Sequence, residues 1–258
     1  LFSYGGVTPE NVETLVHGAM FTRSPNDLKN TAIFIGGSNV SAGEALLAKV
    51  RGTLFDPLRV SIMMDSNGSN TTAAATVLSA SKHIDLTHTT ALVLGGTGPV
   101  GCRVAQILLS QGATVRLASR TLDKAQAMCA QLAQHSDTAK LTAYESTTPE
   151  GLAAACDGAE VIVGAGAARV RFLTAEQLFA LPTLKVALDL NAVAPEGLGG
   201  IAMTDKAVNK QGKVCFGALG VGGTKMKIHT AAIQKLYERN NLVLDTAAIF
   251  AIGRGLTS

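Results

Sequence analysis

Three glycines, Gly96, Gly98 and Gly101, form a G-x-G-x-x-G pattern near the middle of the 258-residue chain. Glycines at this spacing allow a tight turn, the approach of a pyrophosphate to the backbone, and close packing of the next helix on the preceding strand. The helix amino terminus then offers unpaired N–H groups and the positive end of its dipole to phosphates. The residues of this turn predicted to bind a dinucleotide are Gly96, Thr97, Gly98, Pro99, Val100 and Gly101.

The glycine pattern alone is weak evidence, so its surroundings decide its meaning. Residues 91–94 are an apolar run typical of a buried strand, and an apolar helical pattern follows the glycines as far as Gln111 and Gly112. Residues 113–118 form a second strand-like run. A complete βαβ unit is the context that this motif requires. The alternative is a glycine turn in an α/β domain that binds no ligand.

The end of the second predicted strand indicates which dinucleotide binds. NAD enzymes usually place a carboxylate there to hold the ribose 2′-hydroxyl. Here Ser119 and Arg120 occupy the strand end and Lys124 follows, while Asp123 falls inside the next predicted helix. A guanidinium can bind a 2′-phosphate through two hydrogen bonds, and hydroxyls can add more. The sequence therefore favours NADP, the alternative being that Arg120 is merely solvated.

Two further polar or glycine-rich segments follow predicted strands. The first contains Asp65 and runs to Thr72, after a strand and before an alanine-rich helix, which is where α/β folds place ligands. Its alternative is a turn with a helix cap. The second, residues 217–227, is rich in glycine and contains Lys225 and Lys227, of which only one can point into a cleft; solvated lysines are the alternative. The residues of the first segment predicted to bind substrate are Ser66, Asn67, Gly68 and Ser69.

Two more strand ends are expected near the nicotinamide end of the cofactor. Gly164, Ala165 and Gly166 follow one of these strands. Asn191 lies in the loop after the other.

Composition excludes several classes of function. A net charge of +3 without a Lys/Arg run gives no support for nucleic acid binding, and no apolar run reaches the length of a membrane span. The four cysteines are far apart, which predicts reduced thiols in a cytoplasmic protein and no metal site. The histidines are also isolated in sequence, so each is interpreted as a surface or packing residue: His17, His83, His88, His135 and His229.

The predicted elements that position these residues are α/β in class, with a doubly wound parallel sheet of the Rossmann type. We expect a small α/β substrate domain over residues 1–84 and a dinucleotide domain over residues 85–224. Residues 225–258 are predicted to be helices that return to the first domain. The chain starts at Leu1 without a methionine, so a piece of the natural amino terminus is expected to be absent.

Four segments together resemble a known family: SNGSNTTAAA from Ser66, GTGPVG from Gly96, SRTLDKAQA from Ser119, and FGALGVGGTKMKIH from Phe216. They are similar to the bacterial NADP-dependent methylene-tetrahydromethanopterin dehydrogenases of methylotrophs. The first and last segments are much more specific than the glycine pattern, and the likeness covers nearly the whole chain. The resemblance implies two α/β domains with a cleft between them and a homo-oligomer, and also an opening βα unit that this chain lacks.

The resemblance implies oxidation of a pterin substrate, methylene-tetrahydromethanopterin, to its methenyl form by hydride transfer to NADP in one-carbon metabolism. Some members also accept methylene-tetrahydrofolate. The carbon that loses hydride lies between two nitrogens that stabilise the cation, so no general base is needed. The protein must align donor and acceptor at about 3–3.5 Å and exclude water. Asp65 and Lys225 are therefore expected to orient the pterin and tune charge.

Three alternatives remain open. Lys225 would serve a cyclohydrolase activity like that of related folate enzymes that use a lysine. SRTLDKAQA is also similar to shikimate dehydrogenase, which needs a Lys/Asp pair in its first domain; Lys29, Lys49 and Asp65 are the nearby options. A non-catalytic NADPH sensor would bind the cofactor and show no turnover.

Overall fold

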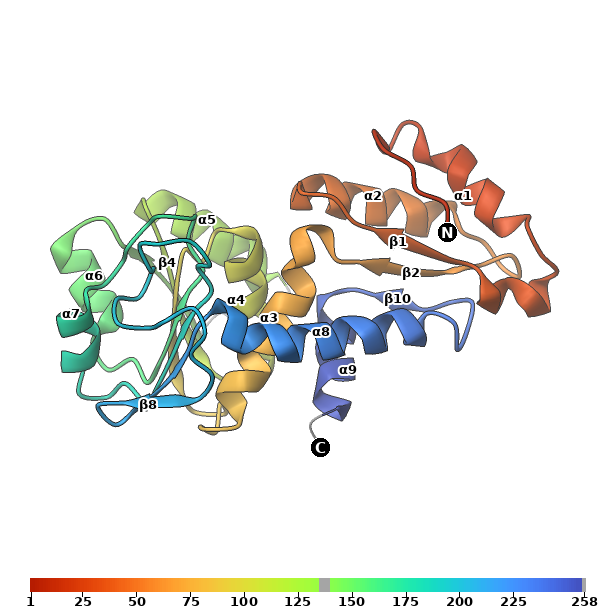
Figure 1. The fold of residues 1–258 in the computed structure, drawn as a ribbon. Coiled ribbons are helices and arrows are strands. Elements are labelled where there is room, and N and C mark those ends of the chain that lie inside the picture. The colour runs from red at the N-terminus through yellow and green to blue at the C-terminus, as the bar shows by residue number, and fades with distance from the viewer. Residues whose placement is uncertain (135–139, 257–258) are drawn as a thin grey trace. The chain divides into compact units, whose positions relative to one another are not determined.

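The computed structural model describes residues 1–134 and 140–256, which form an α/β protein (Figure 1). The chain divides into two compact units. The first unit contains residues 1–71 together with the residues from 227 on, and the second contains residues 72–226. The carboxyl-terminal segment thus belongs to the same compact unit as the amino-terminal one. The sequence placed the boundaries after residues 84 and 224, whereas the contacts change within two helices, α3 (Ser69–Ser81) and α8 (Ala218–Lys235).

The first unit is built on a three-stranded parallel sheet in the order β1-β2-β10. Helices α1 and α2 lie together over one face of β1 and β2 (Figure 1), and Val16, Met20 and Val50 from these helices pack with Ile62 and Met64 of β2 in the core. The elements are α1 (Val12–Met20), η1 (Pro25–Asn30), β1 (Ala32–Ile35), α2 (Val40–Thr53), β2 (Ser61–Met64), η2 (Ser66–Gly68), β10 (Val243–Leu244) and α9 (Thr246–Gly255).

Two local predictions in this unit are wrong, and one short strand is not predicted. Thr8 followed by Pro9 predicts a helix with Thr8 as its N-cap. The first helix instead begins at Val12, because residues 9–11 form a turn in which the Thr8 N–H donates to Asn11 Oδ1 at 2.8 Å. Ser41 and Glu44 predict a capping box for the second helix. The helix is instead capped by Asn39, whose Oδ1 accepts from the Ala42 N–H at 3.1 Å. The sequence does not predict strand β10, because two residues are too short to show a period.

The second unit is a doubly wound sheet of seven strands in the order β5-β4-β3-β6-β7-β9-β8. Helices α4 and α5 lie on one face, with α6 and α7 on the other (Figure 1). All strand pairs are parallel except β8 with β9. The elements are β3 (Thr90–Leu94), α4 (Pro99–Ser110), β4 (Thr114–Ser119), α5 (Leu122–Ala133), β5 (Leu141–Glu145), α6 (Pro149–Cys156), β6 (Val161–Gly164), α7 (Ala175–Ala180), β7 (Val186–Asp189), β8 (Val208–Lys210) and β9 (Lys213–Phe216).

The order of the strands reverses between β3 and β6. The chain winds outward from β3 through β4 to β5, and then returns to pair β6 on the other side of β3. In open α/β sheets, ligands bind beyond the carboxyl ends of the strands at such a switch point. The Rossmann-type fold predicted from the sequence is therefore confirmed.

The glycine-rich segment after β9 differs from expectation. It was predicted to be a loop, but α8 begins at Ala218 and includes every glycine from Gly220 to Gly223. Helix α8 packs closely enough that a Cβ on Gly220 would lie 1.8 Å from the Asp205 carbonyl oxygen. Glycine at this position therefore allows close packing, and does not mark a loop.

No helix of the described residues is both long enough and apolar enough to cross a membrane.

Candidate functional site

The turn after β3 has an additional glycine that the sequence motif does not include. Gly95 has φ +73°, a backbone conformation that residues with a side chain rarely adopt. A Cβ at this position would also lie 2.7 Å from Gly166 Cα. Gly95 therefore makes the tight turn and lets the loops after β3 and β6 meet at the switch point. The doubled glycine at residues 95–96 was the signal that could have shown this.

The motif glycines have separate roles. A Cβ on Gly101 would lie 2.4 Å from the Gly95 carbonyl oxygen, so Gly101 lets α4 pack against the turn. Gly98 is the N-cap of α4, with extended φ and ψ and no side-chain hydrogen bond, and Pro99 follows at the first helical position. Val100 lies in the first turn of α4. The amino terminus of α4 therefore has no capping side chain from the described residues, and its N–H groups can bind an anion.

Polar side chains gather at the carboxyl end of β4. The hydroxyls of Thr97 and Ser119 are 3.0 Å apart, and Ser119 is buried. Arg120 and Lys124 are exposed and form no ion pair with another described residue. The contact between Thr97 and Ser119 thus joins the glycine turn to the carboxyl end of β4, and Arg120 and Lys124 follow Ser119 in the chain.

One carboxylate near this group was missed in the sequence. Glu145 is the register partner of Ser119 on the neighbouring strand β5. Its Oε1 accepts a hydrogen bond from the Thr147 hydroxyl at 2.7 Å. The pairing register of β4 and β5 brings Glu145 beside Ser119. The spacing of these residues along the chain does not indicate that they are neighbours.

The loops after β6 and β7 are held by a buried carboxylate, Asp189. Its oxygens accept from the N–H groups of Asn191 at 3.1 Å, Gly197 at 2.8 Å and Leu198 at 3.1 Å. Burial raises the pKa of Asp189, although these three hydrogen bonds oppose the effect. Gly164 is in contact with this carboxylate, since a Cβ there would lie 3.1 Å from Asp189 Oδ1.

Asn191 was predicted to bind the cofactor. Its side chain forms hydrogen bonds within its own loop. Its Nδ2 donates to the Pro195 carbonyl at 3.0 Å, and its Oδ1 accepts from the Val193 N–H at 3.0 Å. Ala165 N–H donates to the Leu94 carbonyl at 2.9 Å, which ties the 164–166 loop to β3. Asn191 therefore shapes its loop, while Ala165 and Gly166 lie against the glycine turn.

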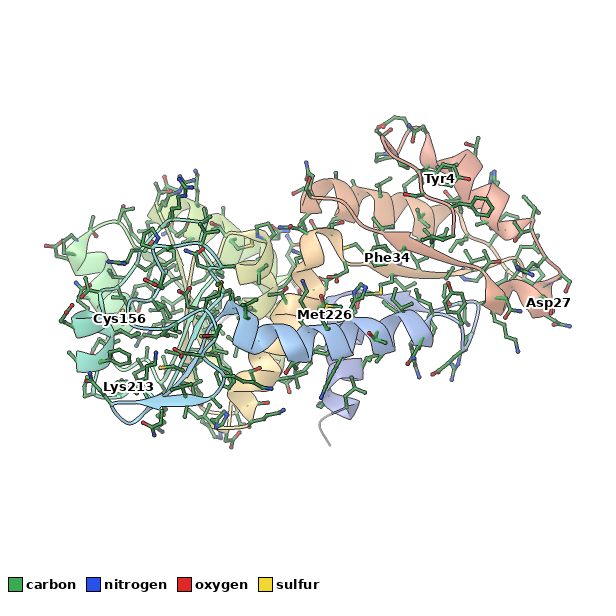
Figure 2. The ribbon with its side chains drawn as sticks, viewed as in Figure 1. Tyr4, Asp27, Phe34, Cys156, Lys213 and Met226 are labelled. Atoms are coloured by element: carbon green, nitrogen blue, oxygen red, sulfur yellow. The ribbon has the colours of Figure 1, made fainter. Side chains whose placement is uncertain are left out.

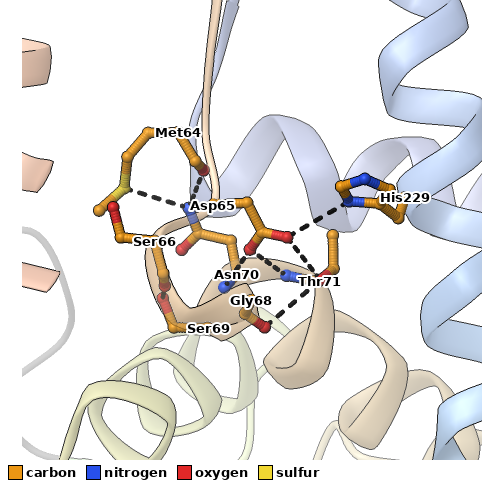
Figure 3. A network of polar contacts seen from close by, with 8 residues as sticks. All are labelled: Met64, Asp65, Ser66, Gly68, Ser69, Asn70, Thr71 and His229. Carbon is orange, nitrogen blue, oxygen red and sulfur yellow. Dashed lines mark hydrogen bonds and ion pairs between the residues drawn. The ribbon is translucent and has the colours of Figure 1, made fainter. Parts of the chain in front are cut away.

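A second polar network lies at the carboxyl edge of the small sheet, around Asp65 (Figure 3). Asp65 Oδ1 accepts from the N–H groups of Asn70 at 3.0 Å and Thr71 at 3.1 Å, and Oδ2 accepts from the Thr71 hydroxyl at 2.7 Å. Only 2% of the Asp65 side chain is exposed. Asp65 thus satisfies N–H groups in the first turn of α3, as an N-cap does.

The four residues predicted to bind substrate mostly serve the backbone of this edge. Ser66 Oγ donates to the Gly36 carbonyl and Ser69 Oγ to the Ser66 carbonyl, each at 2.9 Å. Asn67 and Gly68 both have positive φ. The segment is therefore a shaped turn whose hydroxyls are directed at neighbouring carbonyl groups.

Two contacts from distant segments complete the network. Asn70 Nδ2 donates to the Met64 carbonyl at 2.6 Å, and Asn70 Oδ1 accepts from the Thr246 hydroxyl at 2.8 Å. His229, on α8, lies with Nδ1 3.5 Å from Asp65 Oδ2 (Figure 3). The sequence interpretation set His229 aside as isolated; a carboxylate partner so far away in the chain gives no local signal.

Lys225 lies on α8 four residues before His229 and is half-buried. Its ammonium forms no ion pair with another residue that the structure describes. Because the division between the units follows Met226, Lys225 belongs to the second unit and Asp65 to the first.

No group of three or more potential metal ligands occurs in the described chain. Cys156 (Figure 2) and Cys215 are buried, and burial raises the pKa of each thiol to about 11. His135, one of the histidines considered in the sequence, lies outside the described residues.

Comparison with known proteins identifies the family. A family described as methylene-tetrahydromethanopterin dehydrogenase, N-terminal, matches residues 1–67. A protein of Methylorubrum extorquens named bifunctional protein MdtA is 42% identical over 97% of this chain and 88% of its own length. A second protein of that organism, named NAD(P)-dependent methylenetetrahydromethanopterin dehydrogenase, is 32% identical over 95% of this chain and 86% of its own length. The chain belongs to the methylene-tetrahydromethanopterin dehydrogenase family.

Some solved structures resemble this chain distantly. A transhydrogenase from Sinorhizobium meliloti covers 89% of this chain and 75% of its own, with 12% identity and a TM-score of 0.48. A likeness at this level contributes nothing to the assignment of function.

Proposed function

We propose that this protein oxidises methylene-tetrahydromethanopterin to the methenyl form by hydride transfer to NADP, in one-carbon metabolism. The proposal rests above all on the 32% identity, over 95% of the chain, to a relative named for this reaction. The two carriers, methanopterin and folate, share the reacting methylene group between two nitrogens, so methylene-tetrahydrofolate is a second substrate to test. We also propose that the protein works in the cytoplasm as a homo-oligomer.

The residues of the second unit fit NADP. The α4 amino terminus, uncapped by a side chain and preceded by Gly95, Gly96 and Gly98, suits the pyrophosphate. Arg120 and Lys124, free of acidic partners in the described chain, suit the 2′-phosphate. Bound there, NADP supplies the hydride acceptor.

The remaining work of the protein is to orient the substrate and exclude water, because the substrate nitrogens stabilise the cation themselves. We assign orientation of the pterin to the carboxyl edge of the small sheet around Asp65, and to Lys225. The hydrogen bonds of Ser66 and Ser69 support this role by fixing the turn rather than by supplying free hydroxyls.

A shikimate-type reaction is less well supported by the first unit. Lys49 forms an ion pair with Glu13 at 2.6 Å, and Lys29 forms no ion pair with a described residue. Asp65 accepts a hydrogen bond from an N–H group of α3, and its carboxylate lies near His229. A transferring Lys/Asp pair is therefore not assembled among the described residues of this unit.

The test is formation of NADPH, followed by absorbance, with methylene-tetrahydromethanopterin. Methylene-tetrahydrofolate and NAD serve as the comparison substrate and cofactor, and size-exclusion chromatography of the same sample gives the oligomeric state. We expect turnover with NADP and the methanopterin carrier. NADPH binding without turnover on either carrier would refute the proposal and favour a sensor.

A further inference from the structure

We infer that Asp189 is a positioning residue for hydride transfer, because its carboxylate holds the loops after β6 and β7 that cover the nicotinamide of bound NADP. This inference rests on the proposed function, since it takes NADP to bind with its pyrophosphate at the amino terminus of α4. Only 2% of Asp189 is exposed, so the residue acts through these loops rather than by touching a substrate. The sequence analysis gave Asp189 no role.

The place of the nicotinamide follows from the order of the strands. A dinucleotide lies across the switch point of a doubly wound sheet, with one nucleotide on each side of the glycine turn. In the proposed placement, the 2′-phosphate lies at the carboxyl end of β4, on one side of β3. The nicotinamide half then lies on the other side of β3, over the carboxyl ends of β6 and β7.

Asp189 is the last residue of β7, and its carboxylate accepts hydrogen bonds from both ends of the loop that follows. Oδ1 accepts from the N–H of Asn191, and Oδ2 accepts from those of Gly197 and Leu198. A Cβ on Gly197 would lie 2.8 Å from Oδ1, so glycine at this position lets the backbone approach the carboxylate. Asp189 thus fixes the path of residues 191–198.

The loop after β7 is joined in turn to the loop after β6. The Phe172 N–H donates to the Gly197 carbonyl at 2.8 Å. The Phe172 ring lies against Gly166, since a Cβ there would lie 2.4 Å from Phe172 Cζ. Gly166 also lies against Gly95 in the glycine turn. Contacts therefore run without a break from Asp189 to the turn that is proposed to bind the pyrophosphate.

The reaction depends on alignment more than on acid–base chemistry. A hydride passes from the methylene carbon of the carrier to C4 of the nicotinamide, which gives the methenyl cation and NADPH, and no proton is transferred. Donor and acceptor must lie about 3–3.5 Å apart, and a displacement of about 1 Å can slow a reaction about 100-fold. A carboxylate that fixes the loops over the nicotinamide therefore contributes to the rate of transfer.

The first test is Asp189→Asn, which keeps the size of the side chain. Its amide has a single oxygen, so its NH₂ group would face at least one of the N–H groups that Asp189 now binds. The rate of NADPH formation in a single turnover, at saturating NADP, should fall about 10- to 100-fold. Amide hydrogens of residues 190–198 should exchange faster with solvent.

A binding measurement separates this role from a general effect on stability. The ligands are NADPH and 2′-phospho-ADP-ribose, which is NADP without its nicotinamide. In Asp189→Asn, Kd for NADPH, measured by calorimetry, should rise about fivefold because the nicotinamide loses ordered loops. Kd for 2′-phospho-ADP-ribose should change less than about twofold. A fold that was loosened throughout would bind both ligands more weakly.

Gly197→Ala disturbs the same contact without removing a charge or an acceptor. Its Cβ would lie 2.8 Å from Asp189 Oδ1, so the carboxylate or the loop must move. The single-turnover rate should fall about three- to tenfold. The two substitutions together should cost less than the product of their separate effects, because they loosen one loop. If Asp189→Asn does not fold, the rate and the two affinities of Gly197→Ala decide the question.

Glu160→Gln is the matched control. Glu160 also binds a backbone N–H with its carboxylate, that of Thr90 at 3.2 Å, and forms an ion pair with Lys185 at 2.7 Å. It precedes β6, at the end of the strands opposite to Asp189. Glu160→Gln should lower the unfolding midpoint in urea and leave the transfer rate and both affinities unchanged.

The outcomes separate this inference from the proposed function. If the native protein oxidises the methanopterin substrate and Asp189→Asn transfers hydride at the native rate, the inference alone is wrong. Equal losses of affinity for NADPH and 2′-phospho-ADP-ribose would also overturn it, because Asp189 would then support the whole unit. If the native protein binds neither ligand, the proposed function and the inference fail together.

Discussion

The small and large sheets have similar turns after their strands, but the amino termini of the helices that follow are capped differently. In each, a parallel strand runs into a polar or glycine-rich turn and then into a helix, α3 after β2 and α4 after β3. The first N–H groups of α3 are bonded to the Asp65 carboxylate of the same chain. The first N–H groups of α4 follow Gly98, which has no side chain that could accept a hydrogen bond from them.

This difference decides what each edge can bind. A helix amino terminus attracts anions, and a carboxylate of the protein satisfies that attraction as well as a phosphate does. The small sheet is therefore unsuited to phosphate at α3, because Asp65 already accepts from the first N–H groups of that helix. In the large sheet, the N-cap of α4 makes no side-chain hydrogen bond, and we propose that a phosphate binds there. Each prediction below alters one side of this comparison.

The largest effect is expected from making α4 resemble α3. Gly98 has φ −77° and ψ 166°, which an L-residue can adopt, so Gly98→Asp can cap α4. A carboxylate about 4 Å from a phosphate costs about 4 kcal/mol, so Kd for NADPH, measured by fluorescence titration, should rise on the order of a thousandfold. The free energy of unfolding in urea should rise by up to about 1 kcal/mol from the new cap.

Gly98→Ala is the control for the added Cβ, which would lie 3.2 Å from the Gly95 carbonyl oxygen. It separates the steric cost from the charge. Unchanged NADPH affinity in Gly98→Asp would mean that the α4 terminus is not the pyrophosphate site.

The converse change removes the cap of α3. Asp65→Ala leaves two backbone N–H groups, the Thr71 hydroxyl and His229 without their buried acceptor. We expect a loss of about 3 kcal/mol in the free energy of unfolding, measured in urea. NADPH affinity should be retained in the folded protein. Native stability in this variant would show that Asp65 does not stabilise this edge.

Arg120→Ala tests the phosphate at the other end of the cofactor. Loss of a charge-assisted pair of hydrogen bonds should raise Kd for NADPH about 10- to 100-fold. Kd for NADH should change little, because NADH lacks the 2′-phosphate. Arg51→Ala, an exposed arginine of α2, controls for the change in net charge. Equal losses for both cofactors would assign Arg120 to structure rather than to specificity.

The smallest expected effect comes from Glu145, the register partner of Ser119. Glu145→Gln keeps an oxygen for the Thr147 hydroxyl and removes a negative charge near the predicted 2′-phosphate. Kd for NADPH should fall about twofold, the size of effect usual for partly exposed charges. The change should disappear at high salt, because salt screens such charges. An effect as strong on NADH would contradict this placement.

The sequence by itself determined most elements of the second unit, though not β8 or the start of α8, and the class of its ligand. Short apolar runs with turn residues between them predicted β3, β4 and β6, which the structure confirms. Thr174 and Gln177, three residues apart, are also a capping-box pattern in the sequence, and the structure has this capping box at the start of α7. These signals are local, since periodicity, caps and glycine spacing act within a few residues. The specific segments also indicated the family, which the comparisons confirm.

Only the tertiary structure decided how distant residues meet. The Thr246 hydroxyl bonds Asn70 across 176 positions of the chain, and His229 approaches Asp65 because α8 returns to the first unit. Strand register alone places Glu145 beside Ser119. Such contacts depend on packing between elements, whose energy is absent from any short window of sequence. For this reason the sequence pointed to Asp65, while the fold was needed to find its partner.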